Sequence, residues 1–269
     1  MTKQNDPPAS GTSKVIKGQI KMPTRPKQQP ETKILLATPS YGDSFCGNYV
    51  SSVIQLSTWA ALNNVGLATS FLNYADIAAT RNILLSKFLF EHPTATHLLF
   101  VDDDMGFPVK LVADALALKA DLVGALYPKR RIDLKKLHAA GQEPFDKALA
   151  QANDFVGRVA RVSQTRGRFM TADYIGTGFM LLSRSGLNTF LDRMPELRSE
   201  KRYAGVLPDW PYPHFLTAFD RLSVDDQEFS EDFAFCYRWR NAGLPIWAAR
   251  DGELTHTGTQ VFDARHVNR

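Results

Sequence analysis

The stretch Leu98-Leu99-Phe100-Val101-Asp102-Asp103-Asp104 indicates the fold class of this chain. Four apolar residues that run into an acidic cluster, with Gly106 and Pro108 behind it, are typical of a buried strand that ends at a turn. In open α/β sheets, ligands bind outside the carboxyl ends of the strands. Three adjacent carboxylates repel one another unless a proton or a cation neutralises them, and hard divalent cations prefer oxygen ligands. We therefore expect a metal ion here, and beside it a phosphate-bearing ligand.

A simpler interpretation of the same stretch competes with the metal site. Acidic residues after a strand often begin a turn or cap the next helix, and Pro108 is typical of a first helical turn. Three consecutive Asp residues after so apolar a strand favour the metal site over the turn. The other motifs of the chain must support that choice.

Composition places the chain among globular proteins of ordinary size. With 269 residues, of which 44% are hydrophobic and 22% charged, it can bury one sizeable core. Two distant cysteines, Cys46 and Cys236, give neither a disulfide framework nor a metal-binding spacing, which favours a reducing compartment. No run reaches the roughly 18 apolar residues of a membrane span, and the N-terminus has no signal-peptide core. We expect a cytoplasmic protein.

The positive charge of the chain is concentrated at its N-terminus. Residues 1–31 contain six Lys or Arg and two acidic residues, which accounts for the whole net charge of +4. This segment is rich in Pro, Gln, Lys, Ser and Thr, so we expect a disordered tail. The tail either keeps the chain solvated or contacts an acidic partner such as nucleic acid or anionic lipid.

Predicted strands and helices alternate through the first half of the chain, which indicates a mainly parallel α/β sheet with crossover helices. Strands are expected at 33–38, 67–72, 98–101 and 121–126, and helices at 47–63, 77–91 and 108–119. In the second half, the basic stretch at 129–136 precedes helix-like sequence up to residue 153. We then expect a hairpin of 155–162 with 168–172, a glycine turn and strand at 174–184, an irregular aromatic loop at 195–227, a helix at 231–241 and a strand at 246–249.

Six motifs follow one another in a fixed order along the chain. They are Thr38-Pro39-Ser40-Tyr41, Ala79-Thr80-Arg81-Asn82, Val101-Asp102-Asp103-Asp104, Tyr127-Pro128-Lys129-Arg130, Gly176-Thr177-Gly178-Phe179, and Ser230-Glu231-Asp232 with His256-Thr257-Gly258. In this order the chain resembles metal-dependent glycosyltransferases of the GT-A fold, and among them the Anp1/Mnn9-type enzymes and their bacterial and phage relatives. The resemblance covers roughly residues 34–256. It implies a tail at 1–31 and a single GT-A domain at 32–269, with a nucleotide-sugar half at 32–128 and an acceptor half at 129–269.

The resemblance assigns a donor site and a metal site to these motifs. Asp104, Asp102 and His256 would hold Mn²⁺ or Mg²⁺, and a neutral imidazole is a reasonable ligand beside carboxylates. Arg81 is expected in the first turn of a helix, where the helix dipole disfavours a cation, so a phosphate partner explains it better than an exposed position does. The residues expected to bind the nucleotide sugar are Thr38, Pro39, Ser40, Tyr41, Arg81, Asp102, Asp103, Lys129 and Gly178.

Catalysis is expected at the start of the helix at 231–241. Asp232, with Glu231 beside it, would act as the general base that takes the proton from the acceptor hydroxyl, which implies an inverting reaction. If the enzyme retains configuration, Asp232 would position hydroxyl groups instead. Both residues also suit a plain helix cap.

The sequence thus predicts a glycosyltransferase that moves a hexose from a UDP- or GDP-sugar to an acceptor hydroxyl. Golgi members of the family carry a membrane anchor where this chain has a basic tail, which argues against protein-linked mannan as the acceptor. Bacterial glycans, small molecules and glycosylated nucleic acid stay open as acceptors. One alternative acceptor is a hydroxymethylated base in phage-type DNA. Two further alternatives are a nucleotidyltransferase, which normally has a basic Gly-rich loop after the first strand, and a non-catalytic sugar-binding module.

Overall fold

The computed structural model describes residues 30–42, 44–200, 209–251 and 253–258. The tail that the sequence predicts to be disordered, residues 1–31, lies outside this part of the chain except for its last two residues. All structural statements below concern the described residues.

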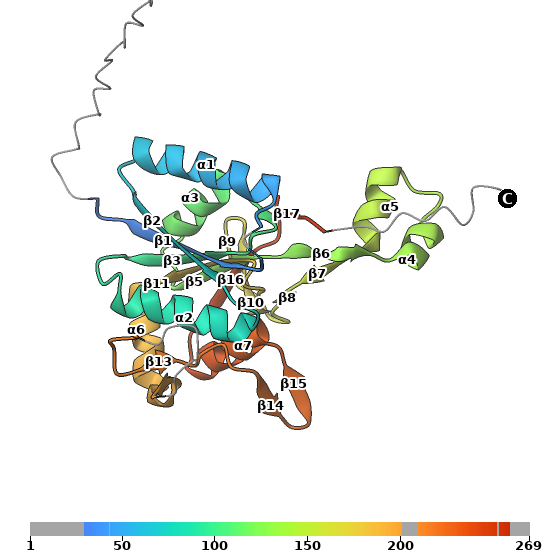
Figure 1. The fold of residues 1–269 in the computed structure, drawn as a ribbon. Helices are drawn as coiled ribbons and strands as arrows, with labels where there is room; N and C mark the ends of the chain where they lie inside the picture. The colour runs from blue at the N-terminus through green and yellow to red at the C-terminus, as the bar shows by residue number, and fades with distance from the viewer. Residues whose placement is uncertain (1–29, 43, 201–208, 252, 259–269) are drawn as a thin grey trace, which may run out of the picture.

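A nine-stranded sheet forms the centre of the molecule (Figure 1). Strands β2, β1 and β3 are parallel neighbours, and so are β5 and β16, while β11 lies antiparallel between β3 and β5. The predicted class, an α/β fold with a mostly parallel sheet, is confirmed. In spatial order the strands are β2 (Gly66–Asn73), β1 (Lys33–Ser40), β3 (His97–Val101), β11 (Phe179–Ser183), β5 (Leu122–Ala125), β16 (Ile246–Ala249), β10 (Phe169–Tyr174) and β8 (Arg158–Val159), and β9 (Thr165–Arg166) pairs with β10.

Helices cover both faces of this sheet, as Figure 1 shows. Alternate residues of each strand point to opposite faces, so Ile34 and Leu36 pack in one core and Leu35 and Ala37 in the other. The first core receives side chains from α1 (Gly47–Leu62) and α3 (Val109–Ala117), and the second from α2 (Ile77–Phe90), α6 (Arg184–Arg193) and α7 (Glu231–Asn241). These helices agree with the sequence-based expectations to within two residues wherever one was made.

An arm, which we define as residues 127–156, projects from the sheet (Figure 1). Its stem is the antiparallel pair β6 (Tyr127–Ile132) and β7 (Asn153–Val156), and its end is formed by α4 (Leu134–Ala139) and α5 (Phe145–Ala152). The predicted hairpin of 155–162 with 168–172 is therefore partly wrong. Only β8 pairs with β10, while β7 pairs with the basic strand β6, because the turn at Gly157 separates the two strands.

Short strand pairs complete the fold and fix the end of the chain. β17 (Thr255–His256) pairs with β4 (Met105–Gly106), which brings His256 next to the Asp102–Asp104 cluster. The loop predicted as irregular at 195–227 contains short regular elements, because its backbone groups pair locally; residues 201–208 within it lie outside the described part. These elements are a 3₁₀ turn (Pro195–Leu197), β12 (Arg198–Ser199) with β13 (Phe215–Leu216), and β14 (Leu222–Val224) with β15 (Gln227–Phe229).

Among the described residues, none of the helices combines the length and the apolar character that crossing a membrane requires.

Candidate active site

A pocket of about 380 Å³ lies at the carboxyl ends of β1 and β3, where the sequence predicts the ligand site. It gathers residues from the ends of these strands, the start of α2, the arm, the start of α7 and β17. Its lining residues are Pro39, Ser40, Tyr41, Tyr74, Ala75, Ile77, Arg81, Asp102, Asp103, Asp104, Tyr127, Arg130, Val156, Glu231, Asp232 and His256. We call it the carboxylate pocket.

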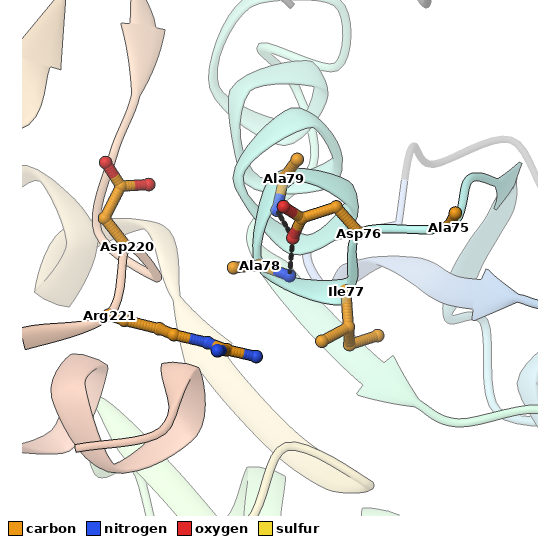
Figure 2. A pocket seen from close by; sticks show the side chains of 7 residues that line it. All are labelled: Ala75, Asp76, Ile77, Ala78, Ala79, Asp220 and Arg221. Atoms are coloured by element: carbon orange, nitrogen blue, oxygen red, sulfur yellow. Dashed lines mark hydrogen bonds between the residues drawn. The ribbon is translucent and has the colours of Figure 1, made fainter. Parts of the chain in front are cut away.

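A larger hollow of about 700 Å³ adjoins this pocket through Ala75 and Ile77 (Figure 2). Both of its carboxylates are engaged within the protein: Asp76 accepts hydrogen bonds from the backbone N–H groups of Ala78 and Ala79, and Asp220 accepts one from Asn82 Nδ2 at 2.7 Å. The Arg221 side chain extends across the hollow in Figure 2. The hollow thus lacks the cluster of titratable groups that distinguishes the carboxylate pocket, which is the better candidate for chemistry.

The first Asp of the cluster is held by a buried arginine. Arg81 is 4% exposed, and its Nη2 lies 3.1 Å from both carboxylate oxygens of Asp102, while its Nη1 donates to Glu231 Oε1 at 2.7 Å. Burial alone would lower the pKa of Arg81, but the two carboxylates outweigh it and raise that pKa. Arg81 is the fifth residue of α2 and lies in its second turn, not the first, and it is not solvent-exposed. Its partners in this structure are carboxylates.

The third Asp is held differently, by an exposed arginine and a histidine. Asp104 Oδ2 accepts from Arg130 Nη1 at 2.7 Å, whereas the buried Oδ1 has no hydrogen-bond partner and lies 3.4 Å from His256 Nε2. His256 Nδ1 lies 2.9 Å from the carbonyl oxygen of Pro128, so this nitrogen carries the proton. Burial lowers the pKa of His256, but the contacts with Asp104 and the Pro128 carbonyl outweigh it, so the net shift is upward. In the neutral ring, a lone pair of Nε2 faces Asp104 Oδ1, and either a proton on Nε2 or a metal cation between the two atoms satisfies both.

This pair fits a divalent metal, but the predicted set of three ligands is not assembled. An unpartnered carboxylate oxygen beside an imidazole nitrogen is a donor set that Mn²⁺ accepts. Asp102, the other predicted ligand, has both oxygens on Arg81. Within the described residues, no three His, Cys, Asp or Glu side chains gather as a metal site. Two protein ligands suit an ion that draws its remaining ligands from water and phosphate oxygens.

The middle Asp faces the loop after β1. Asp103 Oδ2 accepts from the backbone N–H of Tyr41 at 3.2 Å, and burial, reinforced by the neighbouring carboxylates, raises the pKa of Asp103. Pro39, Ser40 and the largely exposed Tyr41 line the pocket, as the sequence suggests. Thr38 differs from the expectation: it is buried, and its hydroxyl pairs with that of Tyr49 at 2.7 Å, because side chains alternate along a strand. Thr38 therefore anchors the loop after β1 to α1 and does not line the pocket.

The start of α7 supplies the two acidic residues expected for catalysis. Glu231 forms the ion pair with Arg81 that is described above. Asp232 accepts hydrogen bonds from the Ser230 hydroxyl and from the Phe233 backbone N–H through the same oxygen, Oδ1. Burial raises the pKa of Asp232 despite these bonds and the nearby Arg81. A carboxylate with a raised pKa is a stronger base than an ordinary aspartate.

Tyr127 is a pocket residue that the sequence-based site did not include. Its hydroxyl accepts from the Gly178 N–H at 3.1 Å, and its ring meets that of His256 edge-on, with 5.5 Å between centroids. A Cβ on Gly176 or Gly178 would overlap the Tyr127 hydroxyl, so both glycines make room for this ring. Gly178, expected to approach the donor, does not line the pocket. The position of Tyr127 directly after a predicted strand was the available signal.

Two neighbouring cations of the arm differ in their place relative to the carboxylate pocket. Arg130, which belongs to the Tyr127–Arg130 motif but not to the expected donor-binding residues, lines the carboxylate pocket and pairs with Asp104. Lys129, expected to bind the donor, lies in an adjoining groove. Arg130 lines this groove as well, so it lies at the boundary of the two sites, whereas Lys129 lines only the groove.

No protein-family model and no curated protein matches the sequence. Among solved structures, the chain is similar to a protein from STIV, with 15% identity over 87% of this chain and 99% of that one and a TM-score of 0.45. It is also similar to the catalytic domain of Drosophila beta1,4galactosyltransferase 7 in complex with xylobiose, with 13% identity over 85% and 71% and a TM-score of 0.43. A third is a glycosyltransferase involved in the glycosylation of the major capsid of PBCV-1, with 8% identity over 67% and 72% and a TM-score of 0.32. These likenesses are low, and the residue roles below rest on the site geometry.

Proposed function

We propose that this protein is a divalent-metal-dependent glycosyltransferase of the GT-A type, which moves a hexose from a UDP- or GDP-sugar to an acceptor hydroxyl. The observation that carries the proposal is the unpartnered Asp104 Oδ1 opposite His256 Nε2, in one pocket with the basic carboxylate Asp232. The volume of the carboxylate pocket, about 380 Å³, lies in the range of small-molecule sites. The finer assignment to the Anp1/Mnn9-like enzymes rests on the six ordered motifs of the sequence.

On the donor side, Asp104 and His256 would hold Mn²⁺ or Mg²⁺. When bound, the ion offsets the charge of the diphosphate and of the departing nucleoside diphosphate. The exposed ring of Tyr41 offers a face to the nucleobase, with Pro39 and Ser40 beside it. Asp102 and Asp103 remain candidates for the ribose, since both line the pocket.

On the acceptor side, Asp232 takes the proton from the attacking hydroxyl. Its burial supports this role, because the raised pKa makes proton uptake more favourable than at an exposed aspartate. Glu231 acts as a positioning residue: its ion pair holds Arg81, and Arg81 in turn holds Asp102. The proposed general-base role of Asp232 corresponds to direct displacement with inversion at the anomeric carbon.

The test avoids the unknown acceptor by measuring nucleoside diphosphate release from the donor alone. The protein is incubated with a panel of UDP- and GDP-sugars, with Mn²⁺ or with EDTA, and thermal stabilisation by UDP and GDP is recorded in parallel. We expect metal-dependent release from one donor and metal-dependent stabilisation by its nucleotide. Both are lost in Asp104→Asn and kept in the matched control Asp192→Asn, whose carboxylate is exposed on α6. Absence of both signals in the unmodified protein contradicts the proposal.

A further inference from the structure

A groove of about 530 Å³ on the arm adjoins the carboxylate pocket through Arg130 and His256. The β6 strand forms one wall, and Leu134 of α4 and Leu149 of α5 form the other. We call it the arm groove. Apart from Arg130 and His256, which it shares with the carboxylate pocket, its lining residues have no part in the proposed transfer reaction.

The strand wall of the arm groove carries unpaired positive charge. Lys129 and Arg131 are exposed, and within the described residues neither has an ion-pair partner. Asp154, whose pKa both cations help to lower, is already bound by Lys136 at 2.6 Å. Asp133, the other nearby carboxylate, caps α4 through the N–H groups of the next residues. The two cations are thus available to an external anion.

Three aliphatic side chains, Ile132, Leu134 and Leu149, lie beside these cations in the groove lining, whose remaining residues are Pro128, Arg130, Asn153, His256 and Gly258. The side chains of Ile132, at the end of β6, and Leu134, at the start of α4, are 43% and 71% exposed. Leu149 lies half-buried beside them. Aliphatic side chains next to unpaired cations are the composition of surfaces that lie in the interface of a membrane, with apolar groups in the acyl boundary and cations at the headgroups.

We propose that the arm groove docks on an anionic lipid surface, with Ile132 and Leu134 inserted and Lys129 and Arg131 on headgroup phosphates. The charge complementarity of Lys129 and Arg131 and the exposed side chains of Ile132 and Leu134 favour a lipid surface over single-stranded nucleic acid. Proteins bind single-stranded nucleic acid with stacked aromatic rings. The described lining of the groove contains no Phe, Tyr or Trp. The inference goes beyond the proposed transfer reaction and is tested without donor, metal or turnover.

The experiment is co-sedimentation of the full chain with vesicles of phosphatidylcholine alone or with phosphatidylglycerol added. We expect binding only to the anionic vesicles. Lys129→Gln with Arg131→Gln should weaken it about fivefold for each cation removed. Ile132→Gln with Leu134→Gln should weaken it about tenfold, because the side chains no longer favour the acyl boundary. The basic residues of segment 1–31 are the same in every variant, so differences report on the arm.

Two matched controls separate the arm from general effects. Ile54→Gln with Leu62→Gln removes an Ile and a Leu that are more exposed, at 61% and 81%, from α1, and Lys119→Gln with Arg221→Gln removes two exposed cations elsewhere. Both controls should bind as the unmodified protein does. The proposal is overturned if the Ile132/Leu134 variant binds vesicles normally or if the controls lose as much. It is also overturned if that variant changes the sedimentation mass without lipid, which would assign the groove to a second copy of the chain.

Discussion

Asp102 and Asp104 are two residues apart on the same turn, yet their surroundings differ in kind. Asp102 meets a buried arginine that a second carboxylate, Glu231, also holds. Asp104 meets Arg130, which is 57% exposed, and keeps one buried oxygen without a partner. The first end of the cluster is electrostatically complete, whereas the second is ready for a cation. The comparison teaches that neighbouring carboxylates of one acidic triplet can have different surroundings: Asp102 is neutralised within the protein, whereas Asp104 keeps an oxygen that the proposed metal could use.

The largest expected effect is on stability and comes from removing Arg81, which neutralises Asp102 and Glu231. Arg81→Met leaves Asp102 and Glu231 as unpaired, partly buried charges, so the free energy of unfolding should fall by about 3–5 kcal/mol in urea denaturation. Arg130→Met removes only an exposed partner and should change it by less than about 1 kcal/mol. Equal losses in the two variants would refute the contrast.

The open end should control metal affinity. In Mn²⁺ titrations followed by electron paramagnetic resonance, Asp104→Asn should weaken binding by more than about tenfold, since it removes a direct ligand. Asp102→Asn, whose oxygens face Arg81, should weaken it clearly less. A larger effect of Asp102→Asn would restore Asp102 as the main ligand, as the sequence suggests.

Tyr127 contacts His256 and Gly178, so its variant separates an effect on stability from an effect on metal binding. Tyr127→Phe keeps the ring against His256 but removes the acceptor of the Gly178 N–H, so we expect a loss of about 1 kcal/mol in the free energy of unfolding. Manganese affinity should stay unchanged in the same variant. A loss of metal affinity without a loss of stability would instead make the hydroxyl part of the ligand site.

The smallest effect concerns how the protonation of Asp232 changes stability with pH. Because the pKa of Asp232 is raised in the folded protein, the folded state binds this proton more tightly than the unfolded chain does. The free energy of unfolding should therefore fall as the pH rises from about 4, the ordinary aspartate value, through the raised pKa. Urea unfolding over a pH series should show this slope reduced in Asp232→Asn and kept in Asp192→Asn. An unchanged slope in Asp232→Asn would contradict the burial of this group.

Local periodicity predicts the elements of this fold well. The helix at 47–63 is found at Gly47–Leu62, and the helix at 231–241 and the strand at 246–249 are found at the predicted bounds. These segments have apolar residues at helical or strand spacing, and their burial depends on that spacing. The arm was not predicted, because the pairing of β6 with β7 joins residues across two intervening helices and leaves no local signal.

In the carboxylate pocket, too, the sequence predicts local positions but not contacts between distant residues. The sequence places Asp102–Asp104 at the end of a strand and Glu231 and Asp232 at the start of a helix, and both positions are correct. It does not reveal that Arg81 joins Asp102 and Glu231, which are 21 and 150 residues away from it. It also does not reveal that Thr38 turns inward to Tyr49.

The sequence by itself determined the α/β class, most of the secondary structure and the edge of the sheet where the acidic residues collect. Apolar spacing and strand polarity are properties of neighbouring residues, so they can be inferred from the chain alone. Only the tertiary structure decided which carboxylate is neutralised by a buried arginine and which oxygen is left open opposite His256. Those choices depend on Coulomb and hydrogen-bond interactions over a few ångströms, between segments that only the folded chain brings together.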